Sequence, residues 1–214
     1  MCSVTVGLLA AAVSPAAGQS AAPSELRAGT LVQPVHLDGV LDEPEWATAP
    51  AIENLTVSEP TAGTVPADRT IVRVLASPQA IVIGVVCQDS DPSRIVSFTK
   101  QRDAVLNTED HVGLVLDTFL DGRSGYLFVV NASGARYDAL INPGGSDANA
   151  DWDGIWDAAV RRDEHGWAVE IWIPIQTLAF KRGLDRWHLN VERRIQRRQE
   201  TDRWVSARPD WALT

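Results

Sequence analysis

Two tryptophans and several aspartates crowd into one polar stretch of the chain. Trp152 and Trp156 lie four residues apart, and an indole ring offers a flat apolar face with one hydrogen-bond donor, the kind of surface on which a pyranose ring stacks. Eight Trp against four Phe and two Tyr is also an unusual balance of aromatic residues. The two rings predict a saccharide-binding platform, with packing in the protein core as the alternative for each of them.

The acidic residues of the same stretch are candidate ligands for a cation. Carboxylates and backbone carbonyls in loops bind Ca²⁺, and Asp147, Asp151 and Asp153 offer such oxygens. Their spacing does not match the twelve-residue helix–loop–helix calcium pattern, so solvated loop acids are the alternative. We predict a structural calcium ion held by these three residues.

Other chemistries have weaker support. A glycosidase needs two carboxylates at a defined separation, and the 28 acidic residues do not single out one pair. The four His show no metal spacing, and no glycine-rich nucleotide loop or serine nucleophile elbow occurs. The net charge of −9 argues against nucleic acid as a partner. The arginines of 193–203 are interleaved with Glu192, Glu200 and Asp202, which predicts a cross-strand charge network. We therefore predict no catalytic residue.

The elements that position these groups are strands. Within Asp110–Gly134 apolar residues alternate along two runs, as in paired strands. Both faces of each run are largely apolar, which predicts a place in the middle of the sandwich. The joining segment Asp117–Gly125 is longer than a tight hairpin, and loops on a rigid scaffold often carry binding groups. Arg123 within this segment and Tyr126 directly after it are therefore candidate ligand-binding residues.

The remaining pattern predicts an all-β fold, an antiparallel, jelly-roll-like β-sandwich of about nine strands with only short helical turns. Asp42 is the predicted cap of a short helix, with Pro44 in its first turn and Trp46 on its inner face. Cys87, within an apolar run, is predicted to be buried. The strand candidates outside the central pair are 70–75, 80–87, 95–102, 135–141, 156–161, 166–173 and 187–198.

The N-terminal residues are typical of an export signal. Val4–Val13 is a short apolar run before small residues, and a cut after Gly18 fits the small-x-small rule. The absence of Lys or Arg before Arg27 departs from the usual basic start. We predict a signal peptide at 1–19, a linker at 20–34 and a sandwich domain at 35–214. The protein would then be exported, either periplasmic or outer-membrane-associated.

Several segments, taken in order and spacing, carry a resemblance to a known family. They are Leu37–Trp46 (LDGVLDEPEW), Cys87–Pro92 (CQDSDP), Glu109–Val112 (EDHV), Gly166–Pro174 (GWAVEIWIP) and Trp187–Arg193 (WHLNVER). Between about Val35 and Trp204 the chain resembles the carbohydrate-binding module family 9-like domain. The likeness is greatest to the version that begins large exported bacterial proteins, where a predicted outer-membrane barrel follows. The resemblance implies a β-sandwich, a bound oligo- or polysaccharide and often structural calcium.

The resemblance transfers the fold better than the site. In xylanase-attached members two Trp hold the sugar, and Asn107 stands where the first of them would lie. We expect a non-catalytic carbohydrate-binding domain. One alternative is a protein-interaction or structural domain of an outer-membrane-associated protein with no sugar binding, and another is an accessory module of a glycoside hydrolase. The predicted ligand-binding residues are Trp152, Trp156, Asn107, Arg123 and Tyr126.

Overall fold

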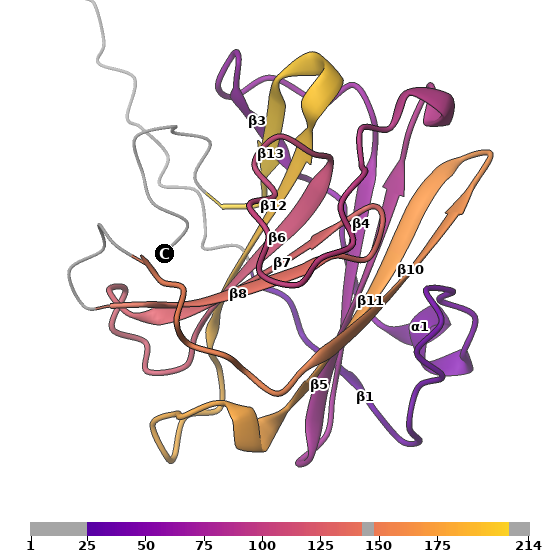
Figure 1. Ribbon diagram of the computed structural model, residues 1–214. Helices are drawn as coiled ribbons and strands as arrows, with labels where there is room; N and C mark the ends of the chain where they lie inside the picture. Colours follow the sequence, from indigo (N-terminus) through magenta and orange to yellow (C-terminus); the bar gives the residue numbers. More distant parts are fainter. Residues whose placement is uncertain (1–24, 143–147, 206–214) are drawn as a thin grey trace, which may run out of the picture.

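The computed structural model describes residues 25–142 and 148–205, which form a sandwich of two β-sheets (Figure 1). One sheet has the strand order β1-β4-β5-β11-β10, with β2 also paired to β4, and the other has the order β3-β13-β12-β6-β7-β8-β9. Within the described residues every pairing except β1 with β4 is antiparallel. The predicted antiparallel β-sandwich is confirmed. The strands are β1 Gly29–Thr30, β2 Ala51–Ile52, β3 Thr56–Glu59, β4 Thr70–Ala76, β5 Ala80–Gln88, β6 His111–Asp117, β7 Gly125–Asn131, β8 Arg136–Ile141, β9 Ala148–Asn149, β10 Asp157–Asp163, β11 Gly166–Pro174, β12 His188–Ile195 and β13 Glu200–Arg203.

The central pair of strands lies where its two apolar faces predict. β6 and β7 are flanked on both sides in their sheet, and Leu114 stands directly opposite Phe128. Both side chains are fully buried and pack in the main core with Ile83 and Ile171 of the opposing sheet. Because side chains alternate along each strand, every second residue of β6 and β7 faces the opposing sheet and packs in the core between the two sheets. Cys87 is also buried in this core, as predicted.

A short helix covers the outer face of the β4–β5 sheet. Helix α1, Pro44–Thr48, places Trp46 against Gly84, where an added Cβ would lie only 2.4 Å from a methyl carbon of Leu41. The indole N–H of Trp46 donates to the buried carboxylate of Glu170 at 3.2 Å. Burial raises the pKa of Glu170. Trp46 thus packs in a small cluster outside the sheet rather than between the two sheets.

Two local predictions were wrong. The helix is present, but Glu43 and not Asp42 occupies the cap position, and it makes no side-chain cap bond. Residues 95–102 form no strand, because Glu109 takes their backbone donors away from any ladder. The N–H groups of Phe98 and Thr99 donate to its carboxylate at 2.7 and 3.3 Å.

The two ends of the sandwich differ. At one end, called the loop end below, the chain leaves β6, β8 and β11 and enters β7, β10 and β12. At the opposite end, called the network end, the chain leaves β5 and β12 and enters β6 and β11. The described part of the chain includes no helix long and apolar enough to cross a membrane.

Candidate functional site

Three loops meet at the loop end, and side-chain hydrogen bonds tie them together (Figure 1). They span residues 118–124, 150–156 and 175–187. The hydroxyl of Tyr126 accepts a hydrogen bond from the backbone N–H of Ala179 at 2.8 Å. Two threonine hydroxyls add bonds of 2.6 Å each, from Thr118 to the Ala179 carbonyl and from Thr177 to the Ile155 carbonyl. The loops therefore form one connected surface.

Asp117, the last residue of β6, binds the backbone of the loop 118–124 through its side chain. Its buried carboxylate accepts the backbone N–H of Phe119 at 3.0 Å and that of Gly122 at 2.9 Å. The ring nitrogen Nδ1 of His188 lies 3.1 Å from the same carboxylate. Gly122 has φ +63°, a left-handed conformation in which a side chain would add strain. These hydrogen bonds stabilise the conformation of the loop 118–124.

Asp121 is the exposed acid of the same loop, and its pKa is lowered. The hydroxyl of Ser124 donates to its carboxylate at 2.7 Å, and the backbone N–H groups of Ser124 and Arg123 donate at 2.8 Å each. These bonds stabilise the charged form. Asp121 therefore remains ionised, unlike the raised-pKa acid that glycoside hydrolysis requires.

Aromatic side chains from all three loops reach the solvent at this end. Phe180 and Trp187 form a tilted pair with ring centroids 5.7 Å apart, and Phe180 is 41% exposed. Phe119 is 40% exposed. The ring of Trp152 lies 5.1 Å from that of buried Tyr126 and is itself partly exposed.

The predicted pair of Trp152 and Trp156 does not form an exposed double platform. Trp156 is only 4% exposed, and its ring meets Phe128 edge-on at 5.1 Å. The guanidinium of Arg136 lies 5.6 Å above its face. Trp156 therefore belongs to the main core, which was the alternative prediction from the sequence. Trp152 alone of the two retains a solvent-facing part.

The predicted calcium ligands do not come together among the described residues. Asp153 pairs with Arg102, which also binds Asp138 at 2.8 Å. Asp151 is exposed, and Asp147 lies outside the described residues. No group of three His, Cys, Asp or Glu side chains arranged to hold a metal ion occurs in residues 25–142 and 148–205. The described donors do not fit a calcium site.

The other predicted residues separate into two places. Arg123 is exposed on the loop 118–124, and Tyr126 holds that end together through its hydroxyl. Asn107 is also exposed, but it precedes the start of β6 and so lies toward the network end. The structure therefore groups Arg123, Tyr126 and Trp152 and leaves Asn107 apart from them.

Sequence reasoning missed the pair formed by Phe180 and Trp187. Trp187 is the first residue of the predicted strand 187–198, whose alternation predicts a core position for it. Phe180 ends the segment 174–180, which the sequence pattern predicts to be a single helical turn. That turn is present as a 3-10 helix at Ile175–Thr177. The one available signal was the basic turn between the two rings, which a core segment would not carry.

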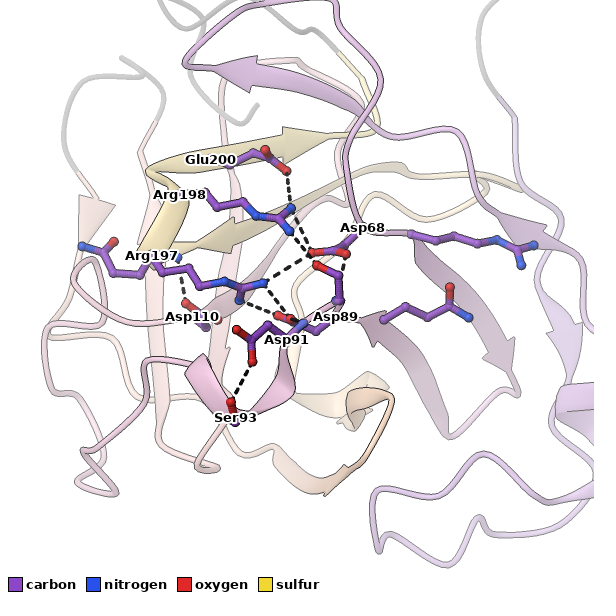
Figure 2. A network of polar contacts seen from close by, with 12 residues as sticks. Asp68, Asp89, Asp91, Ser93, Asp110, Arg197, Arg198 and Glu200 are labelled. Atoms are coloured by element: carbon purple, nitrogen blue, oxygen red, sulfur yellow. Dashed lines mark hydrogen bonds and ion pairs between the residues drawn. The ribbon is translucent and has the colours of Figure 1, made fainter.

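The network end carries the predicted arginine charge network (Figure 2). Arg197 makes two bonds of 2.7 Å to Asp89, and Arg198 lies 2.9 Å from Asp68. Burial alone would raise the pKa of Asp89, but hydrogen bonds from Arg197 and from the Asp91 N–H hold it below its usual value. The predicted cross-strand network is confirmed by Arg203 of β13, which pairs at 2.8 Å with Glu192 directly opposite on β12. Asp68 and Asp89 extend the network to the opposite sheet and its loops.

A hollow of about 470 Å³ lies beside this network. Polar and charged side chains line most of it, and the lining includes no Trp, Tyr or Phe. Its two innermost carboxylates, Asp68 and Asp89, are already paired with arginines. The loop end, where rings reach solvent, is therefore the better candidate for a ligand that stacks. The lining residues are Ala67, Asp68, Arg69, Gln88, Asp89, Ser90, Glu164 and His165.

Comparison with known proteins supports the fold. No protein-family model matches the chain, and no curated protein matches it. A family 9 carbohydrate-binding module from Caldicellulosiruptor kristjanssonii in complex with cellotriose aligns over 85% of each chain, with 13% identity and a TM-score of 0.59. The same kind of module from that organism, in complex with glucose, aligns over 86% of this chain and 87% of that chain, with 14% identity and a TM-score of 0.60. The resemblance to family 9 modules is confirmed for the fold.

Proposed function

We propose that this chain is a non-catalytic carbohydrate-binding domain that holds a saccharide at the loop end. The observation that carries the proposal is the gathering of solvent-facing rings, Phe119, Trp152 and Phe180, on three interlocked loops. The shared fold supports it, because the two similar modules were solved with cellotriose and with glucose.

The chemistry of the loop end suits a sugar. The apolar face of a pyranose stacks on an aromatic ring, and its hydroxyls need donors and acceptors around that ring. Asp121 and the exposed Arg123 supply both kinds of group beside the rings. Because Asp117 already fixes this loop, little conformational entropy is lost on binding.

A binding role fits this end better than catalysis. The buried carboxylate of Asp117 is occupied by backbone N–H groups and His188, and the pKa of Asp121 is lowered. Neither group is prepared to protonate a leaving sugar oxygen. Export through the 1–19 segment and a neighbouring outer-membrane barrel belong to the same proposal.

Calorimetric titration with a panel that includes glucose and cellotriose tests the function, with calcium and then with chelator. We expect binding that Phe180→Ala and Trp152→Ala each weaken about tenfold, because loss of one ring contact removes about 0.5–1.5 kcal/mol beyond its buried area.

The matched control is Phe98→Ala. The side chain of Phe98 is 71% exposed. Its backbone N–H donates to Glu109, which places Phe98 toward the network end. Removal of its ring should therefore leave the affinity for saccharide unchanged. Absence of heat with every sugar from a folded protein would reject the proposal. An equal loss of affinity in the control would reject the assigned location.

A further inference from the structure

The paired rings of Phe180 and Trp187 enclose a basic turn. Their centroids are 5.7 Å apart and their planes meet at 46°, so one ring supports the other. The chain between them turns at Gly183, where φ is +83°. The backbone N–H of Lys181 donates to the Thr118 carbonyl at 3.2 Å, which fastens the turn to the neighbouring loop.

Two cations of this turn have no acidic partner in the described part of the chain. Lys181 and Arg182 are both exposed and make no ion pair there. Arg186, in contrast, lies 3.3 Å from Asp185 and 3.4 Å from Glu25. The chain as a whole carries a net charge of −9. The turn with Lys181 and Arg182 therefore differs from the rest of the protein in carrying exposed positive charge.

In the described part of the chain, the acids of the neighbouring loops form no ion pair with Lys181 or Arg182. Asp121 accepts three hydrogen bonds from its own loop, and Asp153 pairs with Arg102. Asp151 is the remaining exposed acid of the loop 150–156. The turn therefore presents positive charge to solvent next to an apolar ring.

We propose that Phe180, Trp187, Lys181 and Arg182 form a subsite for a saccharide that carries a carboxylate, such as a uronic acid. The sugar ring packs on the partly exposed aromatic pair, and the carboxylate faces the ammonium and guanidinium groups. Arginine binds carboxylates through two parallel hydrogen bonds, which gives direction as well as charge. The inference rests on the proposed function and names the ligand class of the same loop end.

The test compares two double variants that remove the same charge. Lys181→Gln/Arg182→Gln removes the cations of the turn, and Arg161→Gln/Arg162→Gln removes two exposed cations of β10 near the network end. Each protein is titrated with trigalacturonate and with cellotriose at low and high salt. We expect the first variant to lose at least tenfold in affinity for trigalacturonate and less than twofold for cellotriose. The second variant should match the unmodified protein.

The outcomes separate this inference from the proposed function. If cellotriose binds as tightly as trigalacturonate to the unmodified protein, the inference fails and the proposed function stands. If both double variants lose affinity equally, general charge and not this turn is responsible, and the inference fails. If the protein binds phosphatidylglycerol vesicles but neither saccharide, the turn with Phe180 and Trp187 is a lipid-binding surface. The proposed saccharide-binding function and the carboxylate subsite then both fail.

Discussion

Replacing Asp89 with asparagine is expected to lower the free energy of unfolding at pH 7 by about 3–5 kcal/mol. The buried carboxylate receives both hydrogen bonds of the Arg197 guanidinium at 2.7 Å each. Among the described residues, removal of Asp89 leaves the buried guanidinium of Arg197 with only the longer ion pair to Asp68, at 3.6 Å. Breaking a buried pair on one side costs more than the pair itself contributes. Urea denaturation followed by tryptophan fluorescence measures the change.

The matched control and the pH dependence make this prediction specific. The control is Asp91→Asn. Asp91 lies beside Asp89 in the network, and its carboxylate accepts one exposed hydrogen bond, from the hydroxyl of Ser93. We expect this variant to change the free energy of unfolding by less than about 1 kcal/mol. Because the pKa of Asp89 is held below its usual value, its stabilisation is present at neutral pH and is lost as the pH falls through that lowered pKa. The unfolding free energies of Asp89→Asn and of the unmodified protein should therefore become equal in acid. Equal losses in both variants would contradict the account.

Asp202 should behave in the opposite way, since its charge destabilises the fold. It is fully buried, and neither carboxylate oxygen has a hydrogen-bond partner in the described part of the chain. Burial, and then the charge of Glu200, raise the pKa of Asp202 to about 7. A group whose pKa is raised on folding contributes stability that is complete below about pH 4 and is lost as the pH rises toward 7. The loss is about 4 kcal/mol at most, at 1.36 kcal/mol per pKa unit.

Asp202→Asn is therefore expected to be about 2–4 kcal/mol more stable than the unmodified protein at pH 8 and nearly equal to it at pH 4. Denaturation curves at five pH values between 4 and 8 measure this. Asp185→Asn, on an exposed residue, is the control that changes the same charge without burial. A variant of Asp202 that is less stable at pH 8 would show that its carboxylate is a needed partner of Arg193 instead.

The strands were the predictable part of this fold because their signal is local. Alternation along β6 and β7 reflects which side of the sheet each side chain faces, and that depends on neighbours two residues away. The failure at residues 95–102 has a distant cause. Glu109 lies beyond the segment and satisfies its backbone donors with a side chain, which no alternation pattern reveals.

The candidate site was only partly predictable, because exposure of a ring is set by tertiary packing. Trp152 and Trp156 have similar surroundings in the sequence. Trp156 is buried because Phe128 and Arg136 of two other strands meet its ring. Phe180 and Trp187 were missed because a turn brings together two rings seven residues apart.

Mapping of backbone amide shifts in ¹⁵N-labelled protein during saccharide titration tests the central claim most directly. We predict shifts confined to residues 118–124, 150–156 and 175–187, with the network end around Asp89 and Arg197 unchanged. Shifts that gather instead in the polar hollow between Asp68 and His165 would contradict the assigned site. A spectrum of a folded protein that no saccharide alters would contradict the binding function itself.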